Sequence, residues 1–153
     1  WVVNCGLLIC GRHWLNKLDK QLRGSACRTW IAPVKKENEK IKKTTSFVVY
    51  CHTHTGCRLE GTSLLDRVVE NGSALVVFDF RANGFSSGKY VTLGWYEALD
   101  INAVVLFLKI EARATSICLW GRSMGATSLL LYSNQYKTED IILQIVDYAF
   151  YSF

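Results

Sequence analysis

The fold of this chain is decided by the stretch Thr115-Ser116-Ile117-Cys118-Leu119-Trp120-Gly121-Arg122-Ser123-Met124-Gly125-Ala126. The apolar run at 115–120 predicts a buried strand, and the residues from Ala126 to Tyr132 predict a helix. Between them lies a G-x-S-x-G pattern centred on Ser123. Its two glycines let neighbouring backbone pass closely, so the turn can hold the serine in a strained conformation with its hydroxyl exposed. We therefore expect Ser123 to be a nucleophile.

Working outward, short apolar runs alternate with segments of helical period from Thr44 onward. This pattern is typical of βαβ units. It predicts further buried strands at 46–51 and 74–78, and another strand at 141–146. Helices are expected around 64–69, ending at Asn71-Gly72, and around 98–108, where Ala98, Ile101, Val104, Val105 and Leu108 share one face. The predicted class is α/β, with a mostly parallel sheet covered by helices on both faces.

Residues 1–43 predict a separate N-terminal extension ahead of a partial domain at 44–153. The extension contains an expected leading strand at Ser25–Ile31, ended by Pro33. A run of mixed charge, Lys35–Lys43, predicts a solvated loop.

Composition excludes several classes of protein. The chain has 153 residues, of which 50% are apolar and 20% charged, as expected for one globular domain. The net charge of +5 is interleaved with acids rather than clustered among aromatics, so we expect no nucleic-acid partner. Six cysteines contain no C-x-x-C pair, so we expect no zinc and no metal site.

The cysteines and the first residues also bear on location. Cys51 and Cys118 lie in predicted central strands, where reduced thiols behave as small buried apolar groups, and this favours a cytoplasmic protein. The apolar start, 1–10, is about half the length that crosses a bilayer, so we expect no transmembrane segment. Acylation of Cys5 or Cys10 would leave peripheral membrane association open.

Around Ser123, backbone amides provide the expected oxyanion hole. The Met124 N–H lies at a helix N-terminus, where it can point at an oxygen that becomes negative during acyl transfer. A second donor is expected from the loop His52–Arg58.

Three ordered motifs together carry a family resemblance. His52 ends a strand, Asp79-Phe80-Arg81-Ala82-Asn83-Gly84-Phe85-Ser86 corresponds to a D-x-R-G-x-G-x-S loop, and Gly121–Gly125 follows. From about Phe47 to Phe153 the chain resembles α/β hydrolases of the serine aminopeptidase and acyl-thioesterase-like branch. It looks particularly like a protist-type group with Gly94-Trp95-Tyr96-Glu97 and a G-R-S-M-G turn.

The resemblance implies Ser123 as the nucleophile and the backbone amides of Met124 and His54 as the oxyanion donors. It implies neither a metal nor an organic cofactor. Two positions depart from the family pattern: Thr53 and Ala82 replace glycines. A β-branched threonine restricts the backbone that would present the second amide, which puts turnover in doubt but not the fold.

No histidine follows Ser123, although this fold orders its triad as Ser, then acid, then His. Either His52 or His54 is recruited as the base, or the triad is incomplete within this chain. We expect the second, with the chain being the N-terminal portion of a longer protein whose acid and histidine follow residue 153. Asp147 is an alternative acid, although the corresponding residue of relatives is usually structural.

The leading functional hypothesis is a serine hydrolase that cleaves an ester, thioester or amide of a small, acylated or peptide substrate. The alternative is a non-catalytic binding or scaffold module. A nucleotide-binding domain is disfavoured, because no G-x-G-x-x-G follows the first strand. Asp79 and Arg81 are expected to pin their loop through local hydrogen bonds rather than to touch substrate. Trp95 and Tyr96 are expected to pack rather than to form a substrate platform. An apolar sheet edge is expected to make the isolated chain unstable or prone to aggregate.

Overall fold

A five-stranded sheet forms the centre of the molecule in the computed structural model, which describes residues 29–32, 46–136 and 139–150. The strand order is β1-β3-β2-β4-β5. The bounds are β1 Thr29–Ala32, β2 Ser46–Cys51, β3 Ala74–Phe78, β4 Ser116–Arg122 and β5 Ile141–Asp147. Strands β2 to β5 run parallel, whereas β1 pairs antiparallel with β3 at one edge.

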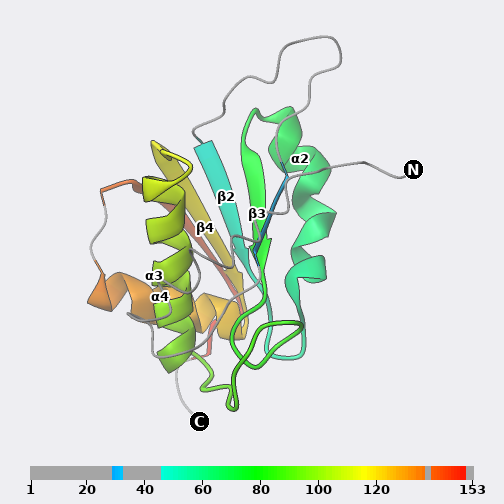
Figure 1. Cartoon of the computed structure of the whole chain (residues 1–153), viewed down its shortest axis with the longest axis vertical. Helices are drawn as coiled ribbons and strands as arrows, with labels where there is room; N and C mark the ends of the chain where they lie inside the picture. The colour runs from blue at the N-terminus through cyan, green and yellow to red at the C-terminus, as the bar shows by residue number, and fades with distance from the viewer. Residues whose placement is uncertain (1–28, 33–45, 137–138, 151–153) are drawn as a thin grey trace.

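Helices cover both faces of this sheet (Figure 1). Helices α3, Trp95–Ile110, and α4, Met124–Gln135, lie on one face, while the 3-10 helix η1, Arg58–Leu64, and helix α2, Leu65–Glu70, lie on the other. Gly72, at a φ of 77°, follows α2 and reverses the chain into β3.

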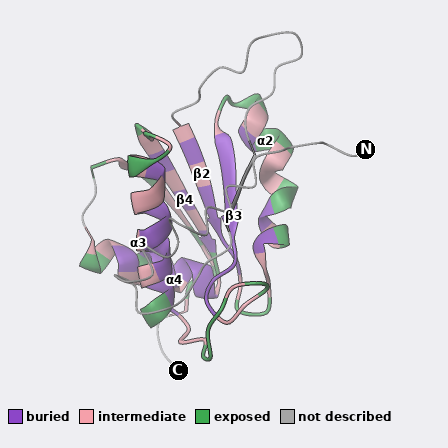
Figure 2. Ribbon diagram, in the orientation of Figure 1, coloured by how far each residue is buried: buried purple, intermediate pink, exposed green. Residues whose placement is uncertain are grey.

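Side chains that alternate along each strand contribute to two apolar layers, one on each face of the sheet. Within β3, Ala74, Val76 and Phe78 pack toward α3 and α4, and Leu75 and Val77 pack toward α2. All five residues of β3 are buried, as Figure 2 shows, because helices cover both of its faces. Because β2 to β5 run parallel, their carboxyl ends meet at one rim of the sheet.

The predicted class is confirmed: this is an α/β protein with a mostly parallel sheet. The five apolar residues expected on one face of α3 are all buried. The expected leading strand is present at Thr29–Ala32, while 1–28 and the charged run Lys35–Lys43 lie outside the described residues. The division at residue 43 stays a prediction. Cys51 is buried as expected, but Cys118 is only half-buried, because its side chain faces the thinner α2 layer.

Strand β5 has no neighbour on its outer edge among the described residues. Ile142, Leu143 and Val146 are 69%, 52% and 41% exposed there. The expected apolar edge is therefore present, and its effect on aggregation stays a prediction.

Candidate active site

Ser123 occupies the sharp turn between β4, which ends at Arg122, and α4, which begins at Met124. Its backbone has φ 51° and ψ −114°, a conformation that non-glycine residues rarely adopt and that stores strain. A Cβ on Gly121 would lie 2.5 Å from the Gly125 carbonyl oxygen, and one on Gly125 would collide with the Cys51 carbonyl oxygen. The two glycines thus allow β4, α4 and the end of β2 to approach one another around the serine.

Backbone hydrogen bonds hold this turn. The Ser123 N–H donates to the Asp147 carbonyl oxygen at 2.9 Å, and the Thr127 N–H donates to the Ser123 carbonyl oxygen at 3.0 Å. Met124 is fully buried and opens α4, so its N–H has no partner within the helix. Its amide therefore carries the positive end of the helix dipole beside Ser123.

The loop after β2 lies next to this turn, since Cys51 pairs with Gly121 in the sheet. Thr53 to Gly56 form a turn in which the Gly56 N–H donates to the Thr53 carbonyl oxygen at 3.0 Å. His54 is exposed within it. Among the described residues, the His54 N–H donates to no acceptor, so it is available to a ligand at the rim.

His52 is fully buried, and both of its ring nitrogens have partners. The Phe80 N–H donates to Nε2 at 3.0 Å, so Nδ1 carries the proton and donates to the Thr53 carbonyl oxygen at 2.6 Å. Burial lowers the pKa of this imidazole below its ordinary value. His52 thus connects the ends of β2 and β3 and has no nitrogen free to take a proton from Ser123.

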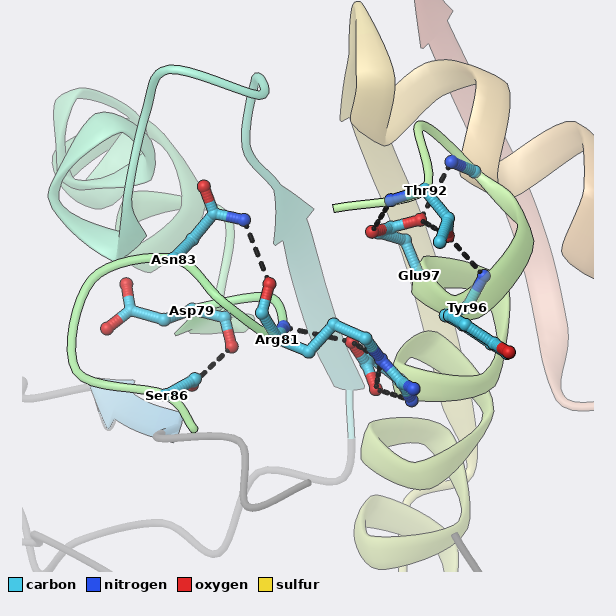
Figure 3. A network of polar contacts seen from close by, with 9 residues as sticks. Asp79, Arg81, Asn83, Ser86, Thr92, Tyr96 and Glu97 are labelled. Carbon is cyan, nitrogen blue, oxygen red and sulfur yellow. Dashed lines mark hydrogen bonds and ion pairs between the residues drawn. The ribbon is translucent and has the colours of Figure 1, made fainter. Parts of the chain in front are cut away.

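Buried carboxylates anchor the loop after β3. Asp79 forms an ion pair with Arg58 and accepts from the Phe85 N–H at 3.0 Å. Arg81 reaches Asp100 of α3 at 2.6 Å (Figure 3). Asp79 accepts locally from the Phe85 N–H, as predicted, whereas the Arg81 guanidinium reaches outside the loop to Asp100 of α3.

Glu97 anchors the far end of the same loop. Its carboxylate accepts from the Thr92 N–H at 2.9 Å, the Thr92 hydroxyl at 2.7 Å and the Gly94 N–H at 2.8 Å (Figure 3). The packing role expected of Trp95 is wrong: its side chain is 61% exposed, because α3 is buried only from Glu97 onward. Tyr96 is 43% exposed and packs against the Arg81 guanidinium, 4.9 Å from its ring centroid.

Asp147 lies at the carboxyl end of β5, level with Arg122. Its carboxylate is 43% exposed and lies 3.5 Å from the Arg122 Nε. Its backbone carbonyl, rather than its carboxylate, contacts Ser123. A role as the triad acid stays a prediction.

Sequence reasoning did not single out four buried or half-buried charged residues: Arg58, Glu60, Glu97 and Asp100. Glu97 and Asp100 share the apolar face of α3, and an acid on such a face is a signal that could have found them. Within the described part of the chain, no group of three or more His, Cys, Asp or Glu could hold a metal ion.

Known proteins resemble this chain over most of its described length. It is 30% identical over 111 residues to the uncharacterized protein YqkD of Bacillus subtilis (strain 168), covering 72% of this chain and 36% of that protein. The esterase EaEST of Exiguobacterium antarcticum superposes with a TM-score of 0.67 at 21% identity, over 83% of this chain and 42% of the esterase. Est1E of Butyrivibrio proteoclasticus, with ferulic acid bound, gives a TM-score of 0.69 at 24% identity, over 80% of this chain and 49% of Est1E.

The chain has the α/β-hydrolase fold, which it shares with these structural neighbours, esterases and a lipase among them. It spans roughly a third to a half of the length of these relatives. No family model matches it. None of the helices in the described ranges is long and apolar enough to cross a membrane.

Proposed function

We propose that this chain carries the nucleophile and the oxyanion hole of a serine hydrolase that cleaves an ester, thioester or amide bond. The observation that carries the proposal is the backbone of Ser123, which lies at a positive φ between a buried parallel strand and a helix. A conformation this strained persists where the surrounding structure holds it, and it is what a turn needs to present a serine hydroxyl.

In the proposed reaction, the Ser123 hydroxyl attacks the acyl carbon while a base takes its proton. The carbonyl oxygen becomes negative and accepts hydrogen bonds from the Met124 and His54 amides. The leaving group departs with a proton, and water releases the acyl group from Ser123. We propose that the base and its acid partner come from residues after 153 in a longer form, because His52 is fully engaged. Asp147 is the alternative acid within this chain.

An ester is the preferred substrate class, since the structural neighbours are named as esterases and a monoglyceride lipase. The test is hydrolysis of p-nitrophenyl acetate and butyrate, with the matched thioester and anilide, by the longest transcript-encoded form. Ser123→Ala should abolish turnover, whereas Ser133→Ala, a matched change in the same helix, should leave it unchanged. Equal turnover by Ser123→Ala and the parent protein would overturn the proposal.

A binding or scaffold module is the second candidate. It is favoured by the hydrogen bonding of His52, which leaves neither ring nitrogen free to act as the base for Ser123. A longest form that is folded, yet inert toward all four substrates, would select this alternative.

A further inference from the structure

The Glu60 carboxylate binds three donors on the neighbouring strand and loop. Its Oε2 accepts from the Thr53 N–H at 3.1 Å and from the Thr53 hydroxyl at 3.0 Å. Its Oε1 accepts from the Tyr50 hydroxyl at 2.8 Å. One half-buried acid therefore joins the end of β2, the loop after it and the start of η1.

We propose that Glu60 is a positioning residue of the oxyanion hole, which clamps Thr53 so that the His54 N–H faces the reacting oxygen. This inference deepens the proposed function and rests on it. It also gives Thr53 a role that a glycine at this position would not have, since the threonine hydroxyl supplies a second bond to the clamp.

Backbone amides at both ends of the turn after β2 already have acceptors. The Thr53 N–H is bound to Glu60, and the Gly56 N–H is bound to the Thr53 carbonyl oxygen. Both ends of the turn are thus fixed by hydrogen bonds. The His54 N–H between them has no acceptor among the described residues, so the clamp leaves this amide free at the rim where Ser123 lies.

The residues around Glu60 leave room for its side chain and fix its backbone. A Cβ on Gly56 would collide with the Glu60 Oε2 and lie 2.9 Å from the Thr53 hydroxyl oxygen. The Glu60 N–H donates to the Cys57 carbonyl oxygen at 2.9 Å, which fixes the backbone of the acid itself. Glycine at 56 therefore makes room for the carboxylate, and η1 holds it in place.

The clamp consists of hydrogen bonds to a carboxylate. Hydrogen bonds to an ionised carboxylate are stronger than those to a neutral oxygen. Burial is the main cause, and the bond to Glu60 the second, of a raised pKa of Tyr50. Its hydroxyl therefore stays protonated and donates to Glu60 over the whole pH range of the assay. An oxyanion hole acts through donors that are already in position. Loss of the clamp should therefore reduce the stabilisation of the transition state more than it reduces the affinity for substrate.

The test compares Glu60→Gln and Thr53→Val in the longest form, with Glu70→Gln as the control. Glu70 is an exposed acid at the end of α2, and its side chain binds no other group among the described residues. The readouts are kcat and KM for p-nitrophenyl butyrate and the inhibition constant of a trifluoromethyl ketone, whose adduct places a negative oxygen in the hole. Unfolding midpoints are measured alongside.

Glu60→Gln should lower kcat by about tenfold or more, less than the hundredfold or greater loss on deleting a donor, because the amide is displaced rather than removed. KM should change less than twofold, and ketone affinity should fall in proportion to kcat/KM. Thr53→Val should give a smaller change of the same kind, and Glu70→Gln none.

Unchanged kcat and ketone affinity in Glu60→Gln would overturn the clamp, while turnover by the parent protein would leave the proposed function standing. A parent protein that turns over no substrate would overturn the proposed function and the clamp with it. If Glu60→Gln does not fold, Thr53→Val decides: reduced kcat with a native unfolding midpoint supports the clamp, and unchanged kcat refutes it.

Discussion

Acid should destabilise the fold through His52. This side chain is fully buried, accepts from the Phe80 N–H and donates to the Thr53 carbonyl oxygen. Protonation of Nε2 would convert the acceptor of the Phe80 N–H into a donor and place a charge in the core. Burial accordingly lowers the pKa of His52 below its ordinary value of 6.5.

The sign of the effect follows from proton linkage. A histidine with a lowered pKa in the folded state binds a proton more readily when unfolded, so stability is full above pH 6.5 and falls below it. Each pH unit below that value, down to the folded pKa, costs about 1.4 kcal/mol of unfolding free energy. The urea midpoint should therefore be lower at pH 5.5 than at pH 7.5, by at most about 1.4 M.

Urea unfolding at pH 7.5 and 5.5 checks this in the parent protein, His52→Gln and His54→Gln. His52→Gln should lower stability at pH 7.5 and remove the part of the pH dependence that His52 contributes, at most about 1.4 kcal/mol between the two pH values. His54→Gln should keep the parent pH dependence, because this side chain is exposed. Equal pH dependence in His52→Gln and the parent protein would refute the reasoning.

Three further changes test the packing around the site. Gly125→Ala should destabilise the protein by about 1–3 kcal/mol in urea unfolding, because the alanine Cβ meets the Cys51 carbonyl. Alanine ordinarily favours a helix over glycine by about 1 kcal/mol, so a stabilised variant would contradict the close approach. Asp100→Asn should lower stability by about 3–5 kcal/mol by removing the carboxylate that pairs with the buried Arg81 guanidinium, and a loss below 1 kcal/mol would contradict that pairing. Lys109→Met removes a partly exposed ion pair with Asp140 and should change the unfolding free energy by less than about 1 kcal/mol.

The sheet and the turn around Ser123 could be predicted because local patterns specify them. Continuous apolar runs bounded by turn residues located β2 to β5, and glycines on either side of Ser123 located the junction of β4 and α4. These signals lie within a few residues of the structure that they specify.

The contacts that shape the rest of the site could not be predicted in the same way. Glu60 binds Thr53 seven residues earlier, and Arg58 pairs with Asp79 across 21 residues. Such pairs depend on how the loops after β2 and β3 contact each other at the rim of the sheet. The periodicity of apolar residues does not predict contacts between loops. The exposure of Trp95 was missed for a similar reason, since it depends on where α3 begins to pack.

Labelling with a fluorophosphonate, followed by peptide mass mapping, tests the central claim most directly. The longest form, Ser123→Ala and Ser133→Ala are treated in parallel. We predict one adduct on Ser123 in the parent protein and in Ser133→Ala, and none in Ser123→Ala. A folded parent protein without an adduct, or with an adduct on another residue, would contradict it.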